Sequence, residues 1–170
     1  MNQADPNLAE EFVIARELAA PRELVWRAWT EPGRLAQWWG PRIMSTPVCE
    51  MEVRPGGAYR IVMRGPDGTE YPIRGTFLEV APPVRLVLTM DCSEHPPAWH
   101  QLVKPGSKPG ENPAGILLTT VTFEEIGGRT ALTIQTRFDS SAIADAMAKM
   151  GMTEGWSGSL ERLAELLDRA

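Results

Sequence analysis

TEGWSGSLERLAELLDRA, residues 153–170, is the stretch that decides the fold of this chain. Four apolar residues recur in it at intervals of four, three and four: Trp156, Leu160, Leu163 and Leu167. This spacing places them on one face of a helix, while the charged residues fall mostly on the other side. Thr153 is a suitable N-cap, and Glu154 stands in the first turn, where the helix dipole favours a negative charge. The stretch therefore predicts a long amphipathic helix that buries one face against the rest of the chain.

Two glycines, Gly155 and Gly158, flank Trp156 within this helix. Each lowers helix stability by about 1 kcal/mol relative to alanine, so another factor must favour glycine here. One explanation is close packing against another backbone, and the other is space left for a ligand. The sequence leaves both explanations open.

Length and charge limit the classes of protein that the chain can belong to. Its 170 residues are enough for one domain with its own core, which we expect over residues 11–170 after a polar, flexible lead-in over residues 1–10. The net charge of -5 argues against nucleic acid or an anionic membrane surface as a partner. There is no apolar run of membrane-spanning length and no signal-peptide pattern, which predicts a cytoplasmic location. The two cysteines, Cys49 and Cys92, then read as buried thiols.

Upstream of the final helix the apolar residues mostly alternate, which is typical of strands that bury one face. We expect strands over residues 12–18, 48–53, 58–64, 70–80, 85–92, 116–125 and 129–138. Two short helices, over residues 21–29 and from Pro32 to the Trp38–Trp39 pair, follow the first strand, and another precedes the final helix over residues 141–150. Tight turns between successive strands indicate an antiparallel meander. The predicted fold is α+β, with a curved antiparallel sheet of six to seven strands wrapped around the C-terminal helix.

Residues 93–115 are rich in proline and glycine and show no period, so we expect a long connection without regular structure. Connections of this length inside a compact domain are often lids or binding loops.

Several segments carry a resemblance to a known superfamily. They are LAQWWGP at residues 35–41, RPGG at 54–57, GTFLEV at 75–80, LTTVTFEEIGGRTALTIQTRF at 118–138 and GWSGSLERLAELL at 155–167. With the element order, they resemble the SRPBCC superfamily, also called START-like or helix-grip. Within it, the chain is similar to the bacterial branch related to the activator of the heat-shock-protein-90 ATPase. The resemblance implies a deep apolar cavity between the sheet and the long helix, although the 93–115 loop is longer than in the simplest members.

Nine residues are expected to line such a cavity, most of them apolar with a few hydroxyls for orientation. They are Trp39, Tyr59, Ile61, Met63, Phe77, Met90, Trp99, Thr119 and Trp156. Met147, Met150 and Met152, with Met63 and Met90, would give an adaptable lining. Adjacent helical residues point about 100° apart, so Trp38 and Trp39 are not both expected to be fully in the core.

His95 and His100, with Asp91 and Glu94 nearby, form the one acid–base cluster worth testing, and two surface histidines are the simpler interpretation. No metal site is predicted, because His95, His100 and Glu94 lack a regular spacing, and no cofactor motif is present. Arg16 shares strand parity with apolar residues and should have an acidic partner. Arg60, Arg64 and Arg74 should face solvent.

Three functional hypotheses remain. The first is binding of an apolar or amphipathic small molecule in the cavity, without catalysis. The second is a chaperone-linked module that binds protein through its surface, and the third is an enzyme that uses His95 or His100. A homodimer formed through an edge strand or the apolar loop is a further hypothesis.

Overall fold

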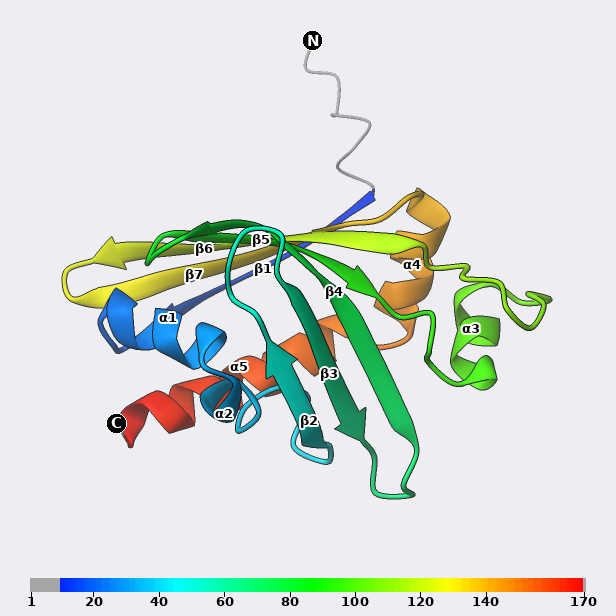
Figure 1. Cartoon of the computed structure of the whole chain (residues 1–170), viewed down its shortest axis with the longest axis horizontal. Helices are drawn as coiled ribbons and strands as arrows, with labels where there is room; N and C mark the ends of the chain where they lie inside the picture. Colours follow the sequence, from blue (N-terminus) through cyan, green and yellow to red (C-terminus); the bar gives the residue numbers. More distant parts are fainter. Residues whose placement is uncertain (1–9, 170) are drawn as a thin grey trace, which may run out of the picture.

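The computed structural model describes residues 10–169 of the chain, and within them one antiparallel sheet of seven strands is covered by helices (Figure 1). The strands are β1 (Glu11–Leu18), β2 (Ser45–Met51), β3 (Ala58–Arg64), β4 (Glu70–Ala81), β5 (Arg85–Asp91), β6 (Ile116–Ile126) and β7 (Arg129–Arg137). The helices are α1 (Arg22–Thr30), α2 (Pro32–Leu35), α3 (Pro97–Val103), α4 (Ser141–Lys149) and α5 (Met152–Asp168). The predicted α+β helix-grip fold is confirmed. The lead-in expected over residues 1–10 lies, up to residue 9, outside the described residues.

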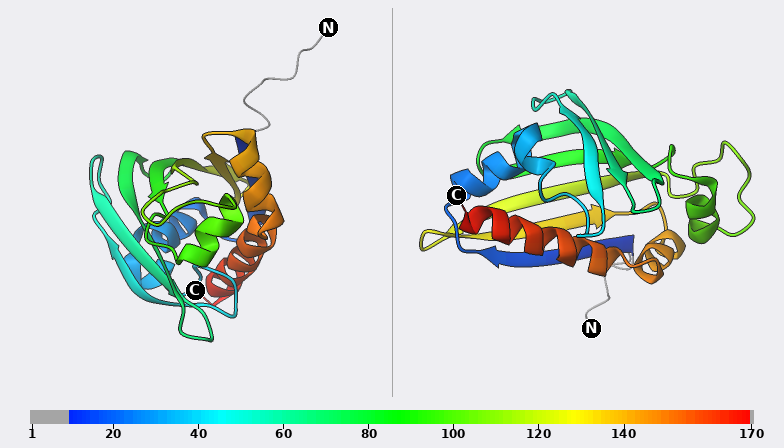
Figure 2. Two further views of the ribbon diagram at one scale, coloured as in Figure 1. Left: turned by 90° about the vertical axis from the view of Figure 1, so that its right-hand side faces the viewer. Right: turned by 90° about the horizontal axis from the view of Figure 1, so that it is seen from below.

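The strands are ordered β1-β7-β6-β5-β4-β3-β2, so β1 closes the meander beside the last strand of the chain. Figure 2 shows the sheet curling around α5, which lies across its concave side. The helices α1 and α2 cover one end of this concave side, and α3 and α4 stand at the other end. The long helix therefore has a different set of neighbours along each half of its length.

The alternation of β6 and β7 builds the concave face. Leu117, Val121 and Phe123 of β6 are buried, and so are their counterparts on β7. Thr119 and Thr136 are paired across the two strands, and their hydroxyl oxygens lie 3.0 Å apart in the core. Each hydroxyl thus has a partner, which removes the penalty for burying a polar group.

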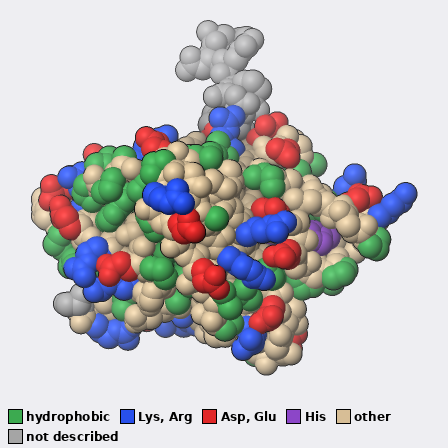
Figure 3. All heavy atoms as spheres, viewed as in Figure 1, with side chains coloured by type: hydrophobic (Ala, Val, Ile, Leu, Met, Phe, Trp, Pro, Cys, Tyr) green, Lys and Arg blue, Asp and Glu red, His purple; other side chains and the backbone are tan. Residues whose placement is uncertain are grey.

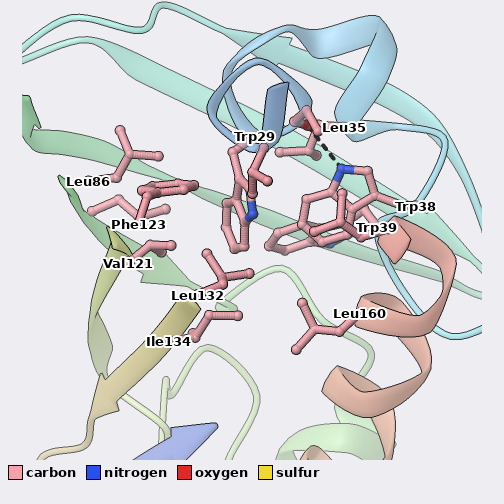
Figure 4. Close-up of a cluster of buried hydrophobic side chains, with 14 of the residues drawn as sticks. Trp29, Leu35, Trp38, Trp39, Leu86, Val121, Phe123, Leu132, Ile134 and Leu160 are labelled. Carbon is pink, nitrogen blue, oxygen red and sulfur yellow. Dashed lines mark hydrogen bonds between the residues drawn. The ribbon is translucent and has the colours of Figure 1, made fainter. Parts of the chain in front are cut away.

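Trp38 and Trp39 are both in the core, at 0% and 5% exposure, which corrects the expectation that one would leave it. The expectation assumed one continuous helix, but α2 ends at Leu35 and the two tryptophans lie in the following turns. The 100° spacing therefore does not apply to them. The Trp38 indole donates to the Ala28 carbonyl over 2.9 Å (Figure 4), and its ring packs on Trp29. An aromatic cluster thus joins the end of α1 to the turns after α2.

The helix α5 begins at Met152. Thr153, which was expected to be the N-cap, is therefore the second residue of the helix and lies inside its first turn. Gly151 occupies the N-cap position in a left-handed conformation, with φ +93°, which a residue with a side chain rarely adopts. The same glycine follows the end of α4, so one residue allows the chain to turn between the two helices. At the start of α4 the Ser140 hydroxyl accepts a hydrogen bond from the Ile143 amide and so caps the helix.

The segment 93–115 contains the helix α3, which corrects the prediction of a connection without regular structure. The helix begins at the second of two prolines, Pro97, and its seven residues are too few to show an apolar period. Proline at the start of a helix is favourable, because its missing amide has no partner there in any case. The side chain of Gln101 then ties the helix to the following turn, where it donates to the Ser107 carbonyl and accepts from the Gly106 amide.

The convex face of the sheet carries charged side chains in pairs. Arg60, Arg64 and Arg74 are exposed, as predicted, and their nearest acidic partners are Glu94, Glu70 and Asp91, at 3.9, 2.8 and 3.4 Å. Figure 3 shows basic and acidic side chains interspersed with apolar ones on this view of the molecule. None of the helices in residues 10–169 combines the length and the apolar character needed to cross a bilayer.

Arg16 lies half-buried on β1, on the face that the alternation predicted. The acidic partner expected for it is not found among residues 10–169, where the ion pairs of β1 and β7 instead join Arg129 to Glu17 and Arg137 to Glu11. Arg16 is therefore not part of a buried ion pair in the described structure.

Candidate functional site

A pocket of about 250 Å³ lies between the concave face of the sheet and the first half of α5. Its walls come from four strands, from the three helices α3, α4 and α5, and from the turns that follow α2 and β5. The lining residues are Trp39, Gly40, Pro41, Met63, Ile73, Met90, Cys92, His95, Trp99, Leu117, Met147, Met150, Gly151, Met152, Gly155, Trp156 and Ser159. No acidic or basic side chain other than the imidazole of His95 is among them, so the pocket is predominantly apolar.

The sheet supplies a floor of four apolar side chains, one from each of four adjacent strands. Met63 of β3, Ile73 of β4, Met90 of β5 and Leu117 of β6 all point to the concave face because each follows the two-residue alternation of its strand. The floor of the pocket is thus a direct extension of the hydrophobic core.

The two glycines of α5 have different roles. A side-chain carbon added at Gly158 would lie 3.5 Å from Pro41, at ordinary contact distance, so this glycine lies against the turn after α2. One added at Gly155 would meet no atom within 4 Å, and Gly155 lines the pocket. Gly158 therefore packs against this turn with room for a methyl group, and Gly155 leaves open space in the pocket.

Five methionines surround the pocket: Met63 and Met90 from the sheet, Met147 and Met150 from the α4 region, and Met152 from α5. Methionine side chains are unbranched and polarisable, so they fit the shape of different apolar partners. Sequence reasoning identified these five residues as an adaptable lining, and the structure brings them to one pocket. Binding itself stays a prediction.

His95 is the most polar side chain of the lining. It is 7% exposed, and its Nδ1 lies 3.0 Å from the Pro72 carbonyl oxygen, to which it donates a hydrogen bond. Its ring packs against Trp99, with ring centroids 4.4 Å apart, and against the edge of Tyr71. Burial lowers the pKa of His95 to about 4, because the charged imidazolium would lose its hydration here. The ring is therefore neutral at pH 7.

Both histidines are buried, which corrects the view of them as surface residues. His100 is 9% exposed, and its Nε2 donates to the Ser93 carbonyl over 3.1 Å. The acid–base cluster is not assembled either, because Asp91 accepts from the Ser93 amide and pairs with Arg74, while Glu94 is directed towards Arg60. In residues 10–169 no group of three or more His, Cys, Asp or Glu side chains is placed to hold a metal ion.

The comparisons with known proteins agree with this architecture. The model of the family described as "Activator of Hsp90 ATPase homolog 1-like protein" matches residues 19–168. The chain belongs to this family. The match contains every residue that lines the pocket, from Trp39 to Ser159, together with the α3 segment.

Solved structures of similar proteins share the fold of this family member. A protein from Nitrosomonas europaea is 29% identical, with a TM-score of 0.78, over 95% of this chain and 96% of that chain. One from Arthrobacter aurescens is 27% identical, with a TM-score of 0.77, over 98% and 91%. One from Rhodobacter sphaeroides, 24% identical with a TM-score of 0.80 over 98% of both chains, shows the fold alone. No curated protein matches the chain.

Five of the nine residues that were expected to line a cavity do line the pocket of this family member: Trp39, Met63, Met90, Trp99 and Trp156. The other four lie elsewhere in the sheet. Ile61, Phe77 and Thr119 are buried on the same strands but belong to the filled part of the core. Tyr59 packs over Gly75, where a side chain would collide with it, and its hydroxyl donates to the Thr89 carbonyl over 2.6 Å.

Ser159, Cys92, Ile73 and Leu117 line the pocket and were missed from the sequence as lining residues. Ser159 stands four residues after Gly155 and three after Trp156, so helical spacing alone could have placed it on their face. Cys92 follows the end of β5, and no pattern distinguished it from a thiol in the filled core. Burial raises the pKa of Cys92 to about 12, so the thiol is protonated and contributes little polarity.

Proposed function

We propose that this protein binds an apolar or amphipathic small molecule in the pocket between the sheet and α5, without catalysing a reaction. The single observation that carries the proposal is the pocket itself, about 250 Å³ of space lined almost entirely by apolar side chains. An interior that had evolved only for stability would be filled to close-packed density. Unfilled apolar space of this kind is what a small-molecule site requires.

The size of the pocket indicates the size of the ligand. An apolar cavity of about 150 Å³ is enough to hold benzene, so a pocket of 250 Å³ suits a molecule of up to about three rings or a short branched chain. A sterol or a long lipid would exceed it. The methionines allow some adjustment, because their side chains change rotamer with little strain.

The histidines do not support the enzyme hypothesis. His95 and His100 each donate a ring N–H to a backbone carbonyl, and the carboxylates of Asp91 and Glu94 are directed towards arginines instead. A general base works best with a pKa near the working pH, and the pKa of His95 lies near 4. Binding without catalysis is therefore the function that the geometry favours.

The open space at Gly155 provides a direct test. We expect Gly155→Leu to place a side chain in the pocket and to weaken binding of the neutral fluorophore N-phenyl-1-naphthylamine at least about tenfold. The same change should leave the free energy of unfolding equal or raise it by up to about 1 kcal/mol, because leucine favours a helix more than glycine does. Fluorescence titration measures the first effect and urea unfolding the second.

Gly158→Ala is the matched control, because it improves the same helix outside the pocket and meets Pro41 only at contact distance. It should bind the fluorophore as the unchanged protein does. Equal affinity in Gly155→Leu and Gly158→Ala would contradict the proposal. If Gly155→Leu does weaken binding, native mass spectrometry of protein purified from its host would identify the natural ligand.

The family description supports one alternative, a module that contacts a chaperone. Such a module needs a contiguous apolar surface. On the convex face the strand register places polar residues beside exposed apolar ones. Leu118 is paired with Arg137 on one side and with Thr89 on the other. Val13 is paired with Gln135. This interruption favours the small-molecule proposal. Stimulation of a heat-shock-protein-90 ATPase by the purified chain would reverse the preference.

A further inference from the structure

The polar groups of the pocket point to the chemical class of its ligand. The Pro72 carbonyl oxygen can only accept a hydrogen bond, so Nδ1 of His95 must carry the proton that it donates there. The Nε2 atom of the neutral ring then has a lone pair and no proton. In residues 10–169 no side chain or backbone group donates a hydrogen bond to this nitrogen, although the residue is only 7% exposed.

The ring cannot easily turn to find another partner. Trp99 and Tyr71 pack against it, and the bond to Pro72 holds the opposite side of the imidazole. Nε2 itself keeps accessible surface, so a ligand that supplies a donor gains a hydrogen bond that an apolar ligand of the same shape lacks. His95 thus presents a fixed acceptor in a predominantly apolar lining.

The lining also excludes charge. It contains no Lys, Arg, Asp or Glu side chain, so an ionised ligand would lose its hydration without gaining a counter-charge. The Ser159 hydroxyl, on a residue 4% exposed, adds a group that can accept or donate a hydrogen bond. His95 and Ser159 are thus the side chains of the lining that can accept strong hydrogen bonds from a ligand.

We propose that the pocket selects an uncharged apolar molecule with one hydroxyl group, and that this hydroxyl donates its hydrogen bond to Nε2 of His95. The inference rests on the proposed binding function and specifies its ligand class. The neutral state of the ring at pH 7 supports it, because a protonated Nε2 would be a donor instead.

Three ligands of one shape test the inference: 2-naphthol, 2-methylnaphthalene and 2-naphthoate, titrated by calorimetry at about pH 7.5. We expect 2-naphthol to bind about tenfold more tightly than 2-methylnaphthalene, the value of one hydrogen bond in a buried site. 2-Naphthoate should bind at least about tenfold more weakly than 2-naphthol. Equal affinity for 2-naphthol and 2-methylnaphthalene, or strongest binding of 2-naphthoate, would overturn the inference.

Two substitutions test the roles of the two ring nitrogens of His95 separately. His95→Asn keeps a donor near the position of Nδ1 for Pro72 and removes the acceptor, so the ratio of the 2-naphthol and 2-methylnaphthalene affinities should fall to within about threefold of one. His95→Gln places an amide oxygen near the position of Nε2 and should keep the preference for 2-naphthol. An undiminished preference in His95→Asn would overturn the role of His95, and so would its loss in Ser159→Ala alone.

A measurement on the unchanged protein keeps the test valid if a variant fails to fold. In ¹⁵N-labelled protein the Nε2 resonance of His95 should move upfield when 2-naphthol binds and stay in place with 2-methylnaphthalene, because only the first donates a hydrogen bond. An unmoved resonance with bound 2-naphthol would overturn the inference while the binding function stands. If none of the three ligands binds and N-phenyl-1-naphthylamine does not bind either, the binding function itself fails.

Discussion

At the scale of single residues, Trp156 belongs both to the core and to the pocket. Its ring stacks on Trp29 with centroids 6.1 Å apart and an interplanar angle of 17°, and it meets Trp39 edge-on at 5.4 Å. It is also one of the lining residues. Leu163, two turns further along α5, is fully buried in the filled core. Substitutions at these two residues therefore compare the half of α5 beside the pocket with the half in the filled core.

We expect Trp156→Ala to weaken binding of N-phenyl-1-naphthylamine about tenfold or more, because it removes one wall of the pocket. Leu163→Ala should lower the free energy of unfolding by about 2–5 kcal/mol and change the affinity of the folded protein by less than about threefold. Fluorescence titration and urea unfolding of both variants check this. Unchanged binding in Trp156→Ala would show that α5 serves only to hold the sheet.

His95 makes the stability of the protein depend on pH in a defined direction. Its pKa is 6.5 in an unfolded chain and about 4 in the folded protein, so the unfolded state binds more protons between these values. The free energy of unfolding should therefore be fully retained above pH 6.5 and fall by up to roughly 3 kcal/mol as the pH is lowered to 4.

Urea unfolding at a series of pH values between 7.5 and 4 measures this effect. His95→Gln is the control, because an amide does not titrate, and its stability should fall less over the same interval. If both proteins lose the same amount, protonation of His95 is not the cause of the loss.

At the scale of elements, the turns after α2 are attached to α5 by one side chain. Arg162 donates to the carbonyl oxygens of Trp39, Gly40 and Pro41 from Nη1, at 3.1, 2.8 and 3.2 Å. Its Nη2 donates to the Gln37 carbonyl over 2.9 Å. The Trp39 and Pro41 carbonyls also accept from the Thr46 hydroxyl and the Met44 amide, so the guanidinium is the donor for those of Gln37 and Gly40. Because Trp39, Gly40 and Pro41 line the pocket, this contact also positions one of its walls.

Arg162→Met keeps the aliphatic part of the side chain and removes the donors. We expect it to lower the free energy of unfolding by about 2–3 kcal/mol, since hydrogen bonds from a charged group contribute about 1.5–3 kcal/mol and the Gln37 and Gly40 carbonyls lose their donor together. The measurement is urea unfolding. Arg169→Met, at an exposed position at the end of the same helix, is the control and should change stability by less than about 0.5 kcal/mol. Similar values for the two variants would show that the contact contributes little.

At the scale of the whole molecule, the interior has a filled half and an open half. Aromatic residues from α1 and the following turns fill the space under one end of the sheet, as Figure 4 shows for Trp29, Trp38 and Phe123. The other end is closed by α3 and α4, whose side chains leave the pocket between them and the strands. Both cysteines are free, and burial raises the pKa of Cys49 to about 11.

Thiol reactivity is therefore a measure of global folding. At pH 8 fewer than about one in a hundred of these thiols is ionised, and only the thiolate reacts with disulfide reagents. We expect both cysteines to react with Ellman's reagent at least about 100-fold more slowly in the native protein than in 6 M guanidinium. Fast reaction of one equivalent in the native state would show that Cys49 or Cys92 is accessible and activated.

Most element types and the meander of β2 to β7 follow from the sequence alone, because the apolar period is a local property, whereas the pairing of β1 with β7 does not. The alternation over residues 116–138 and the four-three-four spacing in 153–170 correspond directly to β6, β7 and α5. The sequence also determined the family, and through it the expectation of a cavity against Trp156. The sequence-based prediction was wrong for α3, because seven residues are too few to show an apolar period. It was also wrong for Trp38 and Trp39, because the helix α2 ends before them.

Only the tertiary structure decided which inward-facing residues meet open space. Ile61 and Met63 have the same strand parity, but Ile61 lies in the filled core and Met63 lines the pocket. The difference depends on which helix covers each position, and such packing joins residues far apart in the chain. Gly155 and Gly158 differ for the same reason, since Pro41 lies against one of them and nothing lies against the other. The local pattern therefore indicates which side chains face inward, and long-range packing determines which of these line the pocket.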